Sequence, residues 1–175
     1  MTNQILATTI GAVIALGAAC PARAAAEDPA SAERLDPNMA VPAADGKLIW
    51  FDALKLGLEG QGWSDVEDPY DRLPAEAEGK VPPAVWSLSR HSAGISVRFV
   101  TDSTTIAARW TLRSDNLAMN HMPATGVSGL DLYVKHDGRW GWLGVGRPEK
   151  REANEGALAS GIPEGMHEYK VYLPL

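Results

Sequence analysis

Two segments of this chain carry an apolar residue at every second position, and this spacing constrains the fold more than any other feature. Residues 95–99 read Ile-Ser-Val-Arg-Phe, and residues 106–113 read Ile-Ala-Ala-Arg-Trp-Thr-Leu-Arg. Because successive side chains of a strand point to opposite faces, the pattern predicts two strands that are each buried on one face. The turn-forming residues 101–104 lie between them, so we expect the two strands to pair as a hairpin.

The same alternation returns later in the chain. Residues 130–134 place Leu, Leu and Val on one face, and the Asp-Gly pair at 137–138 then leads into the segment 140–143. An Asp-Gly pair between two apolar runs is typical of a tight hairpin turn. The sequence therefore predicts a second hairpin here.

The rest of the chain adds strand candidates and few helices. Residues 48–51 and 167–173 are strand candidates, 75–78 predicts a single turn, and 149–159 is expected to form a short helix or a loop. Short strands separated by Gly- and Pro-containing turns predict an all-β fold, specifically an antiparallel β-sandwich of jelly-roll-like form. The apolar end of the chain, 171–175, is expected to form a surface for a following domain. In the isolated domain this surface would be exposed and would promote association.

The N-terminus is typical of an exported protein. Residues 5–19 are almost uninterruptedly small and apolar, and Ala-Arg-Ala follows at 22–24. This run is shorter than the roughly 20 residues of a membrane span, and the triplet resembles a signal peptidase site. We expect a signal peptide over 1–24, with a periplasmic or secreted product. Cys20 leaves a lipid anchor open, and an uncleaved anchor is a third possibility.

Composition then limits the partners. The expected linker covers 25–45 and the expected domain covers 46–175. A single cysteine permits no internal disulfide and no thiolate metal cluster, and the four histidines are scattered. We therefore expect no metal and no cofactor. The formal net charge of −6 argues against nucleic acid, and against a membrane surface beyond the signal peptide, as a partner.

Chemistry-bearing motifs are sparse. Residues 126–129, Gly-Val-Ser-Gly, miss the spacing and context of a nucleophile elbow and are interpreted as a turn that enters a strand. The acidic residues at 67–68 and 76–78 are expected to be solvated. Trp140 and Trp142 share one face of a strand, which fits either a core position or a sugar-stacking platform, and the core position is favoured.

One pentapeptide carries a resemblance to a known family. Residues 129–133, Gly-Leu-Asp-Leu-Tyr, resemble the GxDLY signature of the N-terminal domain of bacterial SGNH (GDSL-like) hydrolase-type esterases. Separate segments agree with it: 70–74 (Tyr-Asp-Arg-Leu-Pro), 85–89 (Val-Trp-Ser-Leu-Ser), 91–95 (His-Ser-Ala-Gly-Ile), 120–126 (Asn-His-Met-Pro-Ala-Thr-Gly) and 172–175 (Tyr-Leu-Pro-Leu). The resemblance covers residues 48–175. It implies a β-sandwich that precedes an α/β hydrolase domain acting on esters, with acylated carbohydrates as the expected substrates.

Candidate site residues follow from the polar groups around the two glycines of this region. We expect one polar patch beside the hydrolase domain, made of His91, Asn120, His121, Thr125, Gly126, Gly129, Asp131 and Tyr133. For Asp131, a structural role in accepting amide protons of the loop 120–128 is favoured over sugar binding. No residue of the chain can be assigned as catalytic, because the serine and Asp-x-x-His blocks of the hydrolase half are not found in it.

The sequence thus favours a non-catalytic accessory domain of an exported SGNH-type carbohydrate esterase, separated from its catalytic half. Its partners would be that catalytic domain and an acylated carbohydrate, and it would shape the active-site entrance or help to select the substrate. The alternative is a free-standing carbohydrate-binding or adhesion module. A complete small hydrolase is disfavoured because no nucleophile motif has the required context.

Overall fold

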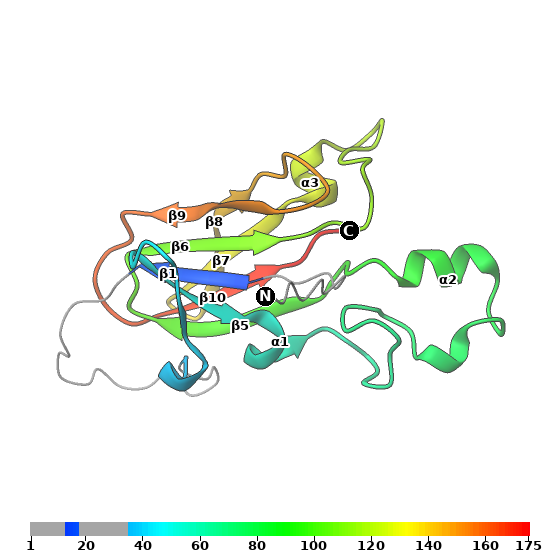
Figure 1. The fold of residues 1–175 in the computed structure, drawn as a ribbon, viewed down its shortest axis with the longest axis horizontal. Helices are drawn as coiled ribbons and strands as arrows, with labels where there is room; N and C mark the ends of the chain where they lie inside the picture. The colour runs from blue at the N-terminus through cyan, green and yellow to red at the C-terminus, as the bar shows by residue number, and fades with distance from the viewer. Residues whose placement is uncertain (1–12, 18–34) are drawn as a thin grey trace, which may run out of the picture.

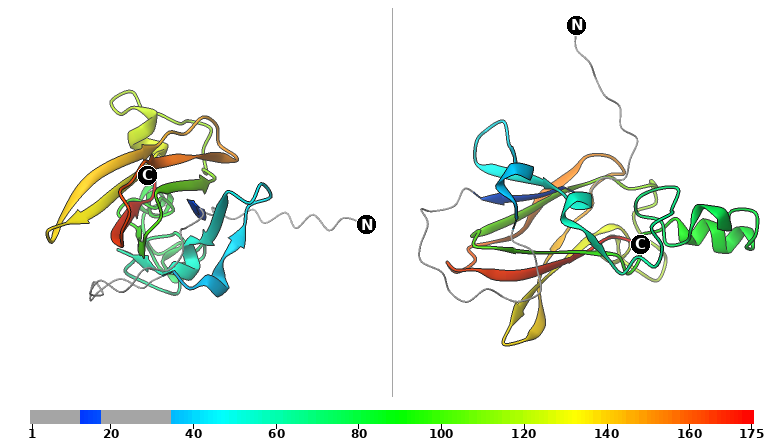
Figure 2. Two further views of the ribbon diagram at one scale, coloured as in Figure 1. Left: turned by 90° about the vertical axis from the view of Figure 1, so that its left-hand side faces the viewer. Right: turned by 90° about the horizontal axis from the view of Figure 1, so that it is seen from below.

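Two five-stranded sheets form the framework of the fold. The computed structural model describes residues 13–17 and 35–175 (Figure 1). The first sheet has the strand order β2-β3-β1-β6-β9, the second has the order β4-β5-β10-β7-β8, and every described pairing is antiparallel. The sheets lie in two layers (Figure 2). The expected all-β antiparallel sandwich is confirmed, whereas its jelly-roll form stays a prediction.

The elements follow one another in short steps. The strands are β1 (Val13–Gly17), β2 (Val41–Pro42), β3 (Leu48–Asp52), β4 (Leu58–Glu59), β5 (Ser96–Thr101), β6 (Thr105–Trp110), β7 (Leu130–His136), β8 (Arg139–Gly146), β9 (Asn154–Ser160) and β10 (His167–Tyr172). The helices are α1 (Ala53–Leu56), α2 (Pro83–Ser89) and α3 (Ala124–Ser128), with 3₁₀ turns at Pro37–Met39 and Ala75–Ala77. The turn expected at 75–78 is therefore present.

The prediction that residues 95–99 and 106–113 pair as a hairpin is wrong. β5 pairs with β4 and β10 in the second sheet, whereas β6 pairs with β1 and β9 in the first. The segment 101–104 is thus a corner at which the chain crosses from one sheet to the other, and the backbone N–H of Ser103 donates to Thr101 Oγ1 there. Both strands still bury their alternating apolar residues, because the two sheets share one core.

The second expected hairpin is confirmed. β7 pairs with β8 up to the facing residues His136 and Arg139. Asp137 and Gly138 between them both have positive φ, 49° and 75°, which a tight turn between twisted strands requires.

Two other segments differ from expectation. Residues 149–159 form no helix; β9 occupies 154–160 and pairs with β6 at the edge of the first sheet. Its alternation is weak because Leu158 is its one large apolar residue, so tertiary pairing decides its conformation. α2, which begins at Pro83, was not expected, although proline at the first helical position favours a helix start.

The core lies between the two sheets. It contains the alternating residues of the sequence pattern, including Val97, Phe99, Ile106 and Leu132, all nearly fully buried. Trp110 is also buried, as expected, and its indole N–H donates to the Ser128 carbonyl at 3.0 Å. This hydrogen bond joins the first sheet to α3.

The C-terminal strand corrects one expectation. β10 is the central strand of the second sheet and pairs with β5 on one side and β7 on the other. Tyr169, Val171 and Leu173 are buried within this domain. The apolar character of the end therefore arises from its place in this core, so the stated reason for expecting association through 171–175 does not hold.

β1 lies inside the expected signal peptide. Its backbone pairs with β3 over five residue pairs and with β6 over four, so it joins the two halves of the first sheet. Residues 1–12 and 18–34, which comprise the rest of the expected leader and the first ten residues of the expected linker, lie outside the described residues. Cleavage after residue 24 stays a prediction, and it would leave β3 and β6 without their common neighbour.

Candidate functional site

A cavity at one end of the sandwich is lined by the residues that follow α2, by the end of α3 and by the C-terminal residues. Its volume is about 340 Å³, and it is lined by residues 90–92, 111–114, 127–128 and 174–175 together with Asn116, Ala118 and Met119. Segments far apart in the sequence thus supply its wall. A volume of this size is within the range of small-molecule sites, roughly 300–1,000 Å³.

The C-terminal residues are fixed against this cavity. The Leu173 N–H donates to the Ile95 carbonyl at 3.0 Å, and the Leu175 N–H donates to the Val127 carbonyl at 2.9 Å. Between them, the buried Ser92 hydroxyl donates to the Pro174 carbonyl at 2.5 Å. These bonds hold residues 173–175 between α3 and the loop after α2.

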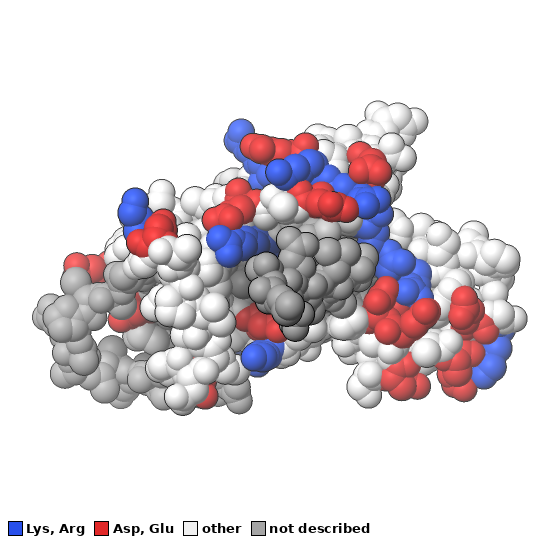
Figure 3. Space-filling model, viewed as in Figure 1, with Lys and Arg blue, Asp and Glu red and all other residues white. Residues whose placement is uncertain are grey.

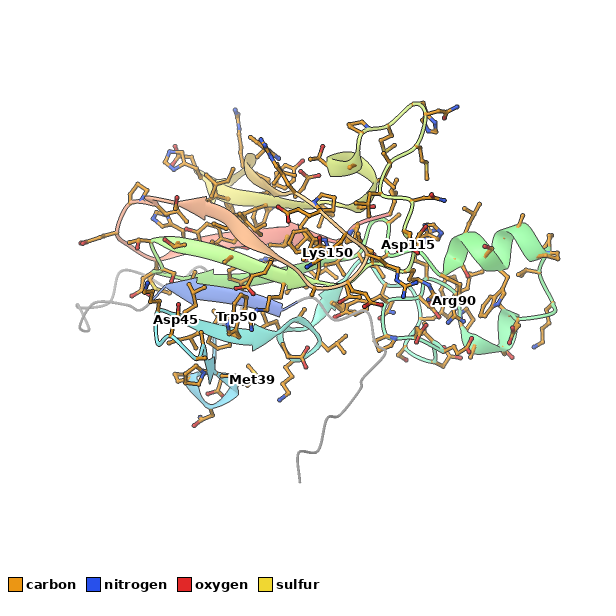
Figure 4. The ribbon with its side chains drawn as sticks, turned by 45° about the horizontal axis from the view of Figure 1, so that its top comes forward. Met39, Asp45, Trp50, Arg90, Asp115 and Lys150 are labelled. Atoms are coloured by element: carbon orange, nitrogen blue, oxygen red, sulfur yellow. The ribbon has the colours of Figure 1, made fainter. Side chains whose placement is uncertain are left out.

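A network of five charged residues, here called the Asp71 cluster, adjoins the cavity: Glu67, Asp68, Asp71, Arg90 and Arg113. The Asp71 carboxylate is 1% exposed and lies 3.1 Å from Arg90 Nε and 3.8 Å from Arg113 Nη1. It also accepts a hydrogen bond from the Asp68 N–H at 3.0 Å. Arg90 lies where the α2 segment joins the sandwich (Figure 4), and acidic and basic side chains are intermixed in that region (Figure 3).

Arg90 is the centre of this cluster. Its guanidinium contacts Glu67, and it also contacts Asp68 at 2.7 Å. Asp68 accepts from Arg113 as well, at 3.0 Å. The carboxylates at 67–68 were expected to be merely solvated; they remain partly exposed but converge on Arg90, which the sequence places more than twenty residues away.

Burial changes the protonation of this cluster. Burial raises the pKa of Asp71, and this effect outweighs the Asp68 N–H and the arginines, which lower it. For Arg90, burial lowers the pKa, but hydrogen bonds to Glu67 and Asp68 more than compensate and hold it above its ordinary value. The cluster is therefore an ion network in which Arg90 stays charged while Asp71 has a weakened tendency to ionise.

Arg72 fixes α2 next to this cluster. Its Nε donates to the His91 carbonyl at 2.9 Å, and its Nη2 donates to the Leu88 carbonyl at 2.6 Å. Carbonyls at a helix C-terminus lack intrahelical donors, so a guanidinium there satisfies them. Asp71 and Arg72, both in the segment 70–74, thus hold the protruding α2 segment to the sandwich.

The structure places the expected site residues on two surfaces. His91 lines the cavity. Asn120 and His121 follow the cavity-lining Met119 in the exposed loop before α3, and their side chains contact one another at 2.9 Å. Thr125 and Gly126 belong to α3. These five residues lie around the cavity end of the sandwich.

Gly129 has a purely steric role. A Cβ at this position would lie 2.3 Å from the Thr125 carbonyl oxygen and 2.8 Å from the Gly146 carbonyl oxygen. Contacts this short with rigid backbone exclude every larger residue, which is why the GxDLY segment begins with glycine. Gly129 therefore lets α3 pack directly against β8.

Asp131 and Tyr133 lie on the outer face of the second sheet and contact a different set of residues. Asp131 accepts a hydrogen bond from the Trp142 indole N–H at 3.0 Å, rather than the loop amide protons that were expected. Tyr133 packs edge-on against Tyr172 with ring centroids 5.7 Å apart. These contacts join the two residues to the aromatic side chains of β8 and β10.

The favoured core position of Trp140 and Trp142 is wrong. Their exposed fractions are 37% and 59%, because both side chains point away from the core on β8. The sequence could not separate the two faces of this strand, since β8 has glycine at 141, 144 and 146 and no apolar alternation on its inner face.

Sequence reasoning did not identify Asp71, Arg90 and Arg113 as site residues. The segment 70–74 was recognised only as part of the resemblance. The partner arginines lie on other elements, so only the fold brings them together.

The described residues offer little direct catalytic chemistry. Among residues 13–17 and 35–175, no group of three or more His, Cys, Asp or Glu side chains could hold a metal ion. Ser128 is buried at the end of α3, so it lacks the exposed position of a nucleophile elbow. In that same part of the chain, no helix is long and apolar enough to cross a membrane.

Comparison with known proteins agrees with this geometry. The family described as GxDLY, the N-terminus of SGNH hydrolase-type esterases, matches residues 48–175. The crystal structure of a GDSL-like lipase from Bacteroides ovatus is similar, with 32% sequence identity and a TM-score of 0.64. The similarity covers 70% of this chain and 35% of that protein, so the chain matches about a third of its length. No curated protein matches the chain.

Proposed function

The chain belongs to the family of N-terminal domains of SGNH hydrolase-type esterases, and on this basis we propose that it is a non-catalytic accessory domain of an exported SGNH-type carbohydrate acyl esterase. Its cavity end docks against the hydrolase domain and forms part of the entrance to the active site. The observation that carries this proposal is the fixed position of residues 173–175 at the cavity.

The C-terminal residues of the sandwich lie at the cavity end. Because the family is the N-terminus of its esterases, we place a hydrolase half after the matched residues 48–175. Leu175 lines the cavity and is bonded to Val127 of α3. A domain joined here starts beside the cavity and the Asp71 cluster.

Exposed apolar side chains at this end support an interface. Val85 and Leu88 on α2, Met119 before α3 and Leu175 are all exposed, Leu88 at 59% and Met119 at 42%. Apolar side chains bordered by polar groups are typical of protein interaction sites. The Asp71 cluster provides the polar part of this surface.

The substrate and the compartment are the finer parts of the proposal. The cavity presents Arg113, Ser114 and Asn116, whose side chains offer hydrogen-bond donors and acceptors of the kind that sugar hydroxyls and ester carbonyls require. Export follows from the leader at 1–24 and gives a periplasmic or secreted enzyme.

A free-standing carbohydrate-binding module is the second candidate. The exposed side chains of Trp140 and Trp142 favour it, because solvent-exposed indoles on a sheet are uncommon without a ligand.

The first experiment separates the two candidates. The DNA downstream of the Leu175 codon is sequenced, and the 175-residue chain is assayed with p-nitrophenyl acetate. We expect a reading frame with a glycine-serine nucleophile block, and no ester hydrolysis by the chain itself. Absence of such a block in every frame would contradict the accessory-domain proposal, and turnover sensitive to a serine inhibitor would contradict the non-catalytic assignment.

The second experiment tests the docking surface. The chain is coexpressed with the hydrolase half and captured by affinity purification, in the wild type and in the variants Leu88→Glu, Met119→Glu and Val41→Glu. A charge within the interface should reduce capture at least tenfold for the first two. Val41 is an equally exposed apolar residue on β2 and serves as the control. Equal capture of all four proteins would refute docking at this end.

A further inference from the structure

Four aromatic side chains lie on the outer face of the second sheet. Tyr133 is on β7, Trp140 and Trp142 are on β8, and Tyr172 is on β10. Tyr133 faces Trp142 across the β7–β8 ladder, and Tyr172 faces Asp131 across the β7–β10 ladder. We call this set, with Asp131, the aromatic face. It extends over three adjacent strands, so its width is about 10 Å.

The rings of the aromatic face are held in place. The Trp142 indole N–H donates to Asp131 at 3.0 Å, although the side chain is largely exposed. Tyr133 and Tyr172 pack edge to face with an interplanar angle of 82°. The Lys170 ammonium lies 5.2 Å from the Trp140 ring centre and 5.9 Å from that of Tyr172. Rings fixed before binding lose little side-chain entropy on contact with a ligand.

The charges beside the aromatic face are mutually compensated. Glu168 pairs with Lys135 at 2.8 Å and with Arg98 at 2.5 Å. Glu59 pairs with Lys170 at 2.9 Å and with Arg98 at 3.3 Å. In support of these pairs, Lys170 and Arg98 lower the pKa of Glu59 although burial opposes them. The three cations are thus paired with two carboxylates, and Asp131 beside them adds a third negative charge, so this surface has no net charge and suits a ligand without net charge.

We propose that the aromatic face binds an unbranched, neutral, β-linked glycan chain. Pyranose rings with equatorial hydroxyls have an apolar face of C–H groups that stacks on indole and phenol rings, while their hydroxyls project sideways. The Tyr hydroxyls, Asp131 and the paired lysines border the rings and can bond to those hydroxyls. A row of rings across adjacent strands can follow an extended chain, whereas a globular protein partner would require a larger apolar core.

This inference deepens the carbohydrate part of the proposed function and rests on that part alone. The aromatic face belongs to strands β7, β8 and β10, whereas docking involves α2, the loop before α3 and Leu175. A glycan can therefore bind here whether or not the hydrolase domain is present. Failure of one proposal leaves the other intact.

The test measures binding of cellohexaose and xylohexaose to the 175-residue chain by titration calorimetry, with an oligogalacturonate of the same length as the anionic probe. We expect at least one neutral probe to bind, and we expect the anionic probe to bind with no higher affinity than that neutral probe. Trp142→Ala and Tyr172→Ala should each weaken binding about tenfold or more, because aromatic anchors carry most of the affinity of such surfaces. Asp131→Ala should weaken it by a smaller factor, since it releases the indole and removes one hydrogen-bonding group but leaves the stacking rings in place.

Trp63→Ala is the matched control, because Trp63 is also an exposed tryptophan but lies in the loop between β4 and α2. It should bind like the wild type, as should the docking variant Leu88→Glu. Circular dichroism confirms that each variant is folded. The proposal is overturned if neither neutral probe binds, if only the anionic probe binds, or if Trp63→Ala weakens binding as much as Trp142→Ala.

Discussion

Replacing Asp71 by alanine should destabilise the domain by about 2–3 kcal/mol. Removing one partner of a buried ion pair typically costs about 3–5 kcal/mol when the other charge is left alone. Here Arg90 keeps its contacts to Glu67 and Asp68, so that part of the cost is avoided. What is lost is the hydrogen bond from the Asp68 N–H and the contacts to Arg90 and Arg113, and a small void is left at a position that is 1% exposed.

Urea unfolding measures this cost, and the melting temperature should fall by about 4–12 °C for a chain of this size. The control is Glu76→Ala, which removes a carboxylate from the ion pair with Lys80. The Glu76 side chain is 72% exposed, so its loss should cost less than about 0.5 kcal/mol. If Asp71→Ala costs no more than Glu76→Ala, the Asp71 cluster does not hold the α2 segment to the sandwich.

The pH dependence gives a second readout of the same residue. Burial raises the pKa of Asp71 above its ordinary value of 3.8, so the folded state holds this proton to a higher pH than the unfolded state does. The stabilising contribution of the protonated group is complete below pH 3.8 and is lost as the pH rises through the folded-state pKa. The stability of the wild type relative to Asp71→Asn should therefore decrease with rising pH over this window. A difference that increases with pH would contradict the assigned direction.

Three further substitutions or deletions test the fold. Gly129→Ala should cost about 2–3 kcal/mol in urea unfolding, because its Cβ would lie 2.3 Å from the Thr125 carbonyl oxygen; a cost below about 0.5 kcal/mol would refute this close packing. Tyr169→Phe should stabilise the protein by about 1 kcal/mol, because the buried hydroxyl has no hydrogen-bond partner among the described residues. The same burial raises the pKa of Tyr169 to about 12. A lower melting temperature of the variant would show that the hydroxyl is bonded. Deleting residues 1–24 removes β1 and should lower the melting temperature, since β3 and β6 lose the strand between them; an unchanged value would mean that these strands pair directly.

Local sequence patterns were sufficient for the strongly alternating strands and for one hairpin. The alternation at 95–99 and 130–134 identified β5 and β7 with their buried faces, because the two-residue period of a strand is a local property. The Asp137-Gly138 turn specified the β7–β8 hairpin, because its positive φ angles belong to those two residues. The GxDLY segment also identified the family by its residues. Its first residue, Gly129, is itself required by a backbone contact.

Tertiary structure decided which strands pair and which faces are exposed. The segment 101–104 is compatible with a hairpin and with a corner between sheets, and only the partners β10 and β9 make it a corner. Trp140 and Trp142 could face either way, because no apolar alternation marks the inner side of β8. The convergence of Asp71 on Arg90 and Arg113 likewise depends on three elements far apart in the chain. Periodicity is encoded by neighbouring residues, whereas pairing, exposure and ion contacts depend on the free energy of the whole packed molecule. This is why the sequence by itself determined the alternating strands, and only the fold decided β9, the strand pairing and the sites.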